Sequence, residues 1–280
     1  MNIPPTEYIR VPVDQLRELS TALFLEASVP RQDADLITNL LIDTDLRGVL
    51  SHGTHQVNGY IRAYLNGDLN TAPQIRVIRD EVTTATVDGD GGLGHLATTR
   101  ATELAITGAK TTGVGAMISQ NHGHFGSAGK YTRMTIQQGY IGFCVSGHTM
   151  AGLAFTGRQW NPLGNPPMSF AFPAGTEAPM ILDMGTSFFE PEHFPSVFEQ
   201  ASAAFFKSIG LVAVANLLGG VMARMVSSEF LGENRQFSAA GLWCVYLCDG
   251  YRTVCAYRSL QVGSRSHHAG NPFASPAAGL

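Results

Sequence analysis

Charged residues are scarce in this chain of 280 residues, because Asp, Glu, Lys and Arg make up only 14% of it and the formal net charge is -4. There is no long basic run, which argues against a nucleic-acid or membrane-surface partner. The first ten residues lack the basic and apolar regions of a signal peptide. No uncharged apolar run is long enough to span a bilayer comfortably. We therefore expect a soluble, cytoplasmic protein.

Cysteine is also rare, with four residues in the chain. Four cysteines do not form a disulfide framework in a chain of this length. Cys244, Cys248 and Cys255 lie in an aromatic, β-prone stretch and lack the tight C-x-x-C pairs of a zinc site. The sequence therefore predicts buried thiols and no resident metal ion.

Glycine, by contrast, is abundant, with 31 residues, which favours a compact, loop-rich α/β enzyme. Apolar residues at helical spacing predict three N-terminal helices, over 13–28, 30–48 and 55–65. After residue 75 the period changes to that of strands. The predicted strands cover 75–78, 83–87, 115–119, 141–146 and 181–183, with helices over 96–112 and 204–225. We expect a helical N-terminal lobe over 1–72, an α/β core over 73–225, and a C-terminal strand and tail over 226–280.

The most informative segment, 45–56, places an aspartate, an arginine, a serine and a histidine at the junction of two predicted helices. A histidine such as His52 can donate a proton to a carbonyl oxygen as hydride arrives, and the Ser51 hydroxyl beside it can orient a substrate. A helix cap with a surface histidine is the competing interpretation. The i, i+4 spacing would place His52, Gln56 and Tyr60 near one face of a helix that starts early enough.

A second histidine segment, 121–126, follows a predicted strand, where active-site loops tend to lie. Two histidines two positions apart could bind a metal ion, although no third ligand has convincing spacing. A metal-dependent hydrolase or lyase that uses His122, His124 and His148 therefore remains a weaker alternative.

The glycine segment 89–94 matches G-x-G-x-x-G, which can bind a dinucleotide pyrophosphate at a helix N-terminus. The acidic residue that should follow about 20 positions later is missing from 109–117. We interpret the glycines as a tight turn between a strand and a helix. Asp183 also follows a strand and could accept hydrogen bonds from a ribose, while Lys207 could contact a phosphate or simply extend to solvent.

Taken in order, these segments resemble the type-2 malate/L-lactate dehydrogenase family, which includes ureidoglycolate dehydrogenase and diketogulonate reductase. The likeness covers roughly residues 8–225, and its motifs follow the family's order. The matching segments are DLRGVLSHG at 45–53, DGDGGLGH at 88–95, HFGSAGKYT at 124–132, IGFCVSG at 141–147, ILDMGTS at 181–187 and KSIGLVAVANLLGGVMA at 207–223.

The resemblance implies an α/β fold with a mixed sheet, flanking helices and an NAD(P) site unlike that of the Rossmann fold. It implies hydride transfer between NADH or NADPH and a small 2-oxo acid, 2-hydroxy acid or imino acid, in a homodimer or higher oligomer. His124 matches the family's catalytic histidine, and Ser51 and His52 match a pair beside the substrate. The cofactor contacts implied by position are His148, Asp183, Met184, Gly185 and Lys207.

Gln56 departs from the family pattern, because it stands where an arginine holds the substrate carboxylate. Glutamine offers neutral donors instead of a charged bidentate fork. We therefore expect Tyr60 and Gln56 near the substrate, with Arg47 or Arg62 supplying the missing charge. The stretch over 188–206 is also shorter than in the family. These departures leave open a second hypothesis, a family member without redox activity that acts as a binding protein or in a non-redox reaction using the same histidines.

Overall fold

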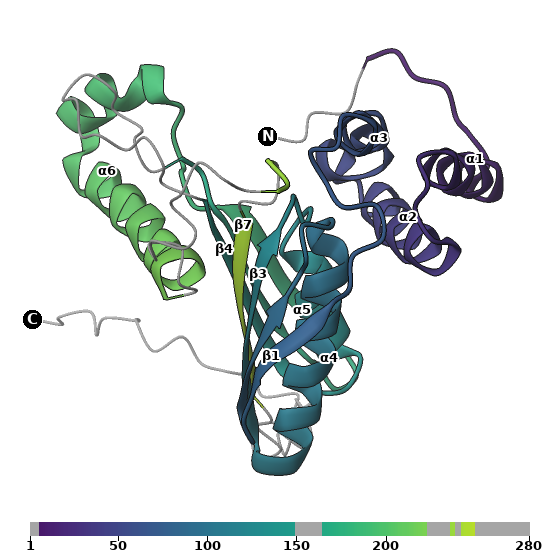
Figure 1. Ribbon diagram of the computed structural model, residues 1–280. Helices are drawn as coiled ribbons and strands as arrows, with labels where there is room; N and C mark the ends of the chain where they lie inside the picture. Colours follow the sequence, from purple (N-terminus) through teal and green to yellow (C-terminus); the bar gives the residue numbers. More distant parts are fainter. Residues whose placement is uncertain (1–5, 149–163, 223–235, 239–241, 250–280) are drawn as a thin grey trace, which may run out of the picture.

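The computed structural model describes residues 6–148, 164–222, 236–238 and 242–249 (Figure 1). It shows an α/β fold in which a mixed sheet of seven strands carries helices on both faces, with a helical lobe beside it. The predicted fold class is therefore confirmed.

The N-terminal lobe consists of three helices, α1 (Val13–Glu26), α2 (Arg31–Leu46) and α3 (Val57–Leu65). Two 3-10 turns, η1 (Leu50–His52) and η2 (Thr54–Gln56), join α2 to α3. The helix predicted over 55–65 thus begins later, at Val57, because the chain first makes these tighter turns. Phe24, Ile37 and Tyr64 pack in the core of the lobe with Leu93 and Leu96 from the start of the next helix, so this core attaches the lobe to the sheet domain.

The sheet has the strand order β1-β2-β3-β7-β4-β5-β6, and only the β2–β3 pair is parallel. A parallel pair needs a crossover, and α4 (Gly94–Thr112) provides it. The strands are β1 (Arg76–Asp80), β2 (Thr84–Asp88), β3 (Val114–His122), β4 (Ile141–His148), β5 (Pro167–Phe172), β6 (Met180–Gly185) and β7 (Leu242–Asp249).

Helices α4 and α5 (Gly129–Ile136) pack on one face of the sheet. The other face carries the π-helical segment Leu217–Val221, which continues α6 (Phe194–Asn216). The apolar helix predicted over 204–225 therefore starts earlier, at Phe194. By length and composition alone, Phe194–Gly220 would suffice to cross a membrane, a test that core helices of soluble proteins also pass.

Strand β7 lies between β3 and β4 in the middle of the sheet. It belongs to residues 226–280, which the sequence predicted to be a separate C-terminal strand and tail. It joins the β1-β2-β3 half of the sheet to the β4-β5-β6 half. Cys244 and Cys248 lie on β7, and Cys255 lies outside the described residues. The domain boundaries themselves stay a prediction.

Gly115 on β3 is required by the close packing of α4 on the sheet. A Cβ atom at this position would overlap the backbone carbonyl of Ala105. Since backbone cannot move aside as a flexible side chain can, we expect Gly115→Val to lower the free energy of unfolding by about 3 kcal/mol. Urea unfolding followed by circular dichroism measures the change.

Gly59→Ala is the matched control, because nothing lies within 4 Å of the Cβ that it adds on α3. We expect the stability of this variant to stay level or to rise by about 0.5–1 kcal/mol, since alanine favours helix more than glycine does. Equal stability of the Gly115→Val variant and the wild type would contradict the packing argument.

Candidate active site

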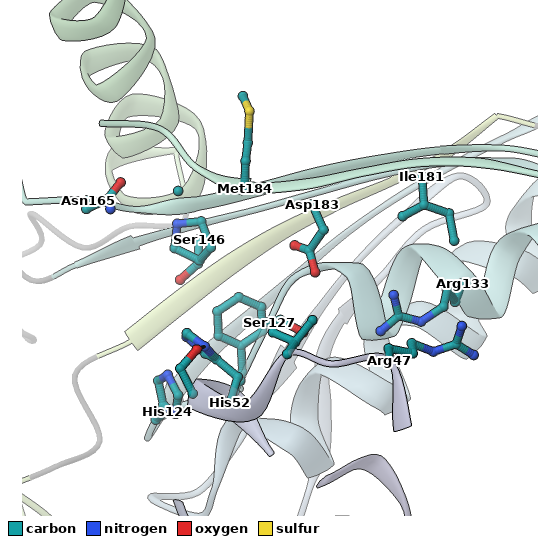
Figure 2. Close-up of a pocket in the computed structure, with 16 residues that line it drawn as sticks. Arg47, His52, His124, Ser127, Arg133, Ser146, Asn165, Ile181, Asp183 and Met184 are labelled. Atoms are coloured by element: carbon teal, nitrogen blue, oxygen red, sulfur yellow. Dashed lines mark hydrogen bonds between the residues drawn. The ribbon is translucent and has the colours of Figure 1, made fainter. Parts of the chain in front are cut away.

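A cleft of about 750 Å³ lies where the N-terminal lobe meets the sheet domain. Figure 2 shows its polar side chains converging from both sides. The walls are formed by Arg47, Val49, Ser51 and His52 from the lobe, by residues 124–127 and Arg133, and by Ser146, Asn165, Pro167, Ile181, Asp183, Met184 and Gly185 from the sheet.

Two histidines predicted to be catalytic, His52 and His124, face the same cleft. Their ring centroids are 5.7 Å apart. The hydroxyl of Ser51 lies 2.8 Å from Nδ1 of His52, and the hydroxyl of Tyr60 lies 2.6 Å from Nδ1 of His124. The structure therefore brings together Ser51 and His124, which are 73 positions apart in the sequence, with His52 and Tyr60 beside them.

Tyr60 fixes the protonation pattern of His124. Burial raises the pKa of the Tyr60 phenol well above its ordinary value, so the phenol keeps its proton. When this hydroxyl donates to Nδ1, the proton of the neutral imidazole lies on Nε2. In this arrangement Nδ1 is engaged by Tyr60, and Nε2 is the ring nitrogen that can meet a substrate.

His52 is held in its neutral form. Burial lowers its pKa, the charge of Lys130 lowers it further, and Asp183 opposes both effects. A neutral imidazole can donate or accept a hydrogen bond, and can take up a proton when an alcohol loses a hydride.

The glycine turn at 89–94 serves the site by positioning His124. The amide of Gly94 donates to the carbonyl of His124 at 3.1 Å, and the amide of Gly123 donates to Gly92 at 2.8 Å. Gly91, with a φ of 75°, donates to Asn121 at 3.0 Å. The amides of Gly91 and Gly94 are thus bonded to protein carbonyls, as in a tight turn between a strand and a helix.

His122 has a structural position. It is fully buried; its Nε2 lies 2.9 Å from the Ser119 hydroxyl and its Nδ1 lies 2.8 Å from the carbonyl of Gly123. Burial lowers its pKa to about 4. Both ring nitrogens are thus engaged, which argues against His122 as a metal ligand. Within the part of the chain that the structure describes, no group of three His, Cys, Asp or Glu side chains is arranged to hold a metal ion.

Gln56 and Tyr60 do not share a helical face directed at the cleft, as the i, i+4 spacing had led us to expect. The amide of Gln56 donates to the carbonyl of Ser51 at 2.7 Å, so it braces the turn and is absent from the cleft wall. Asp45 braces the same turn by accepting from the amide and hydroxyl of Thr54, at 2.9 and 2.5 Å. Arg62 is exposed on α3 and does not line the cleft either, whereas Arg47 does.

Of the predicted cofactor contacts, Asp183, Met184 and Gly185 line the cleft. Asp183 points into it, whereas the Met184 side chain points to the opposite side of β6, as alternation along a strand requires (Figure 2). Burial raises the pKa of Asp183, and a hydrogen bond from the Gly129 amide and the charge of Arg133 oppose this. His148 is the last residue of β4, and Lys207 is exposed on α6, away from the cleft wall.

Lys130 on α5 is a residue that the sequence analysis missed. It is only 2% exposed, and its ammonium lies 3.2 Å from the carbonyl of His52, to which it donates, and 3.1 Å from Nε2 of the buried His95. Gly126, with a φ of 80°, leaves room for it, since a Cβ there would overlap the Lys130 amine. The signal available in the sequence was a single lysine among small residues, SAGK at 127–130.

Burial lowers the pKa of Lys130 to about 7, and the charge of Arg133 acts in the same direction, while Asp183, Asp45 and Asp43 oppose it. Lys130 thus titrates near neutral pH, directly behind the backbone of His52. When the Lys130 amine is protonated, its positive charge lowers the pKa of the His52 imidazole.

Comparisons with known proteins agree with one another. The model of a family described as malate/L-lactate dehydrogenase matches residues 11–193. Malate dehydrogenase of Pyrococcus horikoshii is 39% identical over 180 residues, which cover 64% of this chain and 49% of the relative. L-sulfolactate dehydrogenase of Methanocaldococcus jannaschii is 37% identical over 159 residues, covering 57% and 46%.

The solved structure of the Pyrococcus horikoshii malate dehydrogenase aligns with a TM-score of 0.75 and 28% identity, over 91% of this chain and 78% of that one. The likeness in fold therefore extends beyond the segment matched in sequence. The chain spans about half the length of the curated relatives it matches.

The buried Lys130 gives the fold a specific pH dependence. The pKa of this amine falls from 10.5 to about 7 on folding, so between these values the unfolded chain binds more protons than the folded chain. The free energy of unfolding should therefore gain from Lys130 as the pH rises from 7 toward 10. Lys130→Met should remove this component, which urea unfolding at pH 7, 8, 9 and 10 measures.

We expect the difference in free energy of unfolding, variant minus wild type, to be more favourable to the variant at pH 7 than at pH 10. At every pH the variant also loses the hydrogen bond to the His52 carbonyl. Lys110→Met, on the exposed side of α4, is the control for the loss of a lysine. If the Lys130→Met curve runs parallel to the wild-type curve across this range, Lys130 does not carry the shift.

Proposed function

Because the chain belongs to the malate/L-lactate dehydrogenase family, we propose that it is a dehydrogenase that transfers a hydride between NADH or NADPH and a small 2-oxo acid, with the 2-hydroxy acid as the reduced product. The observation that carries the proposal is the pair of imidazoles, His52 and His124, whose ring centroids are 5.7 Å apart in one cleft. Imidazole is the side chain best suited to move a proton near neutral pH.

The residues of the cleft fit a nicotinamide cofactor. Its volume of about 750 Å³ lies in the range of cofactor sites. Asp183 presents a half-buried carboxylate that can accept hydrogen bonds from ribose hydroxyls, and Gly185 and Asn165 form the adjoining wall. The bound nicotinamide would supply or accept the hydride. His148 and Lys207 stay predicted contacts, as does the choice between NAD and NADP.

The chain's own residues handle the proton. During reduction the carbonyl carbon receives the hydride and the carbonyl oxygen receives a proton, for which Nε2 of the protonated His124 ring is the proposed donor, and the ring is left neutral. The Tyr60 hydroxyl orients that ring through its 2.6 Å contact with Nδ1. His52, oriented by Ser51, lies on the same side and can hydrogen-bond the developing alkoxide. In the oxidative direction the same atoms move the proton back.

The substrate class rests on the relatives' names, which specify malate and sulfolactate dehydrogenases. We propose a small hydroxy acid of this kind, with Arg47 as the cation at the cleft wall that can meet an acid group. A location in the cytoplasm and assembly as a homodimer remain part of the proposal.

The non-redox alternative keeps one observation in its favour, because Gln56 is turned onto the Ser51 carbonyl and brings no charge to the cleft. The two functions separate in one titration. A dehydrogenase binds NADH or NADPH with a change in cofactor fluorescence and oxidises hydroxy acids such as malate, lactate or sulfolactate. If neither cofactor binds at millimolar concentration, the dehydrogenase proposal is wrong.

His124→Asn provides a sharper test of the mechanism. Asparagine keeps a hydrogen-bonding group next to Tyr60 but cannot transfer the proton, so we expect kcat to fall about 100-fold to 10,000-fold while the cofactor Kd stays unchanged. Stopped-flow measurement of cofactor oxidation and a fluorescence titration give the two quantities.

His55→Asn is the matched control, because His55 lies on η2, is exposed and does not line the cleft. Its kcat should stay at the wild-type level. Wild-type turnover in the His124→Asn variant would assign proton transfer to another residue.

A further inference from the structure

Arg133 on α5 is a buried guanidinium whose hydrogen-bonding capacity is largely unused. Its side chain is 10% exposed, and among the described residues neither its Nε nor its Nη2 has a hydrogen-bond partner. A buried charged donor without a partner is costly, so such groups are found where an anion completes them. Burial lowers the pKa of Arg133, and the charge of Arg47 lowers it further, while Asp43 and Asp183 oppose both effects.

The nearest carboxylate, that of Asp43, is already engaged. Arg47 donates to both of its oxygens, at 2.9 and 3.0 Å, whereas Nε of Arg133 lies 3.6 Å away, beyond hydrogen-bonding distance. The hydrogen bonds to this carboxylate thus come from Arg47, and Arg133 makes none with it.

Asp183, the other carboxylate near Arg133, attracts its charge but leaves its donors Nε and Nη2 unpaired within the described part of the chain. Burial raises the pKa of Asp183, which disfavours its charged form. Nε and Nη2 of Arg133 therefore stay available to an anion that enters the cleft.

Both arginines line the cleft, and they lie at the end away from the reacting histidines. Figure 2 shows Arg47 and Arg133 together on one side, His52 and His124 on the other, and Asp183 between them. A ligand that reaches both ends would have its reacting carbon near the imidazoles and an acid group near the guanidinium pair.

We propose that Arg133 and Arg47 form an anion-binding site at this end of the cleft, which takes an acid group of the substrate, a carboxylate or a sulfonate. The planar guanidinium groups suit the two oxygens of such a group. The site lies on α5 and at the end of α2, so it supplies the positive charge that Gln56 on the neighbouring turn does not. This inference rests on the proposed function for the identity of the ligand, but the binding of an anion can be measured without turnover.

The first experiment uses no cofactor and no reaction. Malonate, a small dicarboxylate, is titrated into the full-length protein while the melting temperature is followed. We expect malonate to raise the melting temperature of the wild type in the millimolar range, and Arg133→Met and Arg47→Met each to lose this shift. Arg62→Gln, which removes an exposed arginine outside the cleft, should keep it. Equal shifts in the wild type and both cleft variants would overturn the site.

The second experiment identifies the source of the anion. In steady-state assays we expect Arg133→Met to raise the KM for the hydroxy acid about 30-fold or more while the Kd for NADH or NADPH stays unchanged, and Arg133→Lys to restore part of the loss. If the cofactor Kd rises instead, the pair binds a cofactor phosphate and the assignment to substrate is wrong. Because Arg133 is buried, Arg47→Met serves as the second variant, since its side chain is 44% exposed and its loss perturbs packing less.

A failure of the proposed function would look different. A wild-type protein that binds neither cofactor, yet is stabilised by malonate through Arg133 and Arg47, would retain the anion site and lose the dehydrogenase assignment.

Discussion

One buried amine connects the elements that make the site. Lys130 projects from α5 to the carbonyl of His52 on η1 and to His95 on α4, so three segments distant in sequence meet at a single nitrogen. Burying the amine removes it from water, which disfavours its charged form and lowers its pKa. The backbone carbonyl of His52 is thus held by an amine whose pKa is about 7. Gly126 leaves space for this amine, because a Cβ atom at that position would overlap it.

The surroundings of the cleft shift several ionisable groups toward neutrality. Burial is the leading cause of the lowered pKa values of His52, Lys130 and Arg133, and of the raised values of Asp183 and Tyr60. A neutral His52 can accept a proton or a hydrogen bond, and the protonated phenol of Tyr60 can orient the ring of His124. The arginines are the exception, because guanidinium stays protonated even when buried.

The sequence predicted the parts of this site that local patterns encode. Ser51 and His52, the histidine segment at 121–126 and the strand that carries Asp183 were found, because each belongs to or follows a recognisable helix or strand. Lys130 and Arg133 were missed because α5 is a short helix rich in polar residues and was not predicted from the sequence. The position of β7 between β3 and β4 was not predictable from local patterns, since strand order depends on contacts between distant segments.

The contact that Gln56 makes changes the interpretation of this residue. From the sequence it looked like a lost carboxylate clamp, but its amide holds the Ser51 carbonyl and Asp45 holds Thr54, so both residues stiffen the turn that presents His52. The charge missing from this turn is present elsewhere in the cleft, on Arg47 and Arg133. The two proposals therefore assign proton transfer and anion binding to opposite ends of one cleft. On these proposals, a substrate with its acid group at the arginine end must be long enough for its carbonyl to reach His124, so substrate length would matter more than the residue at position 56.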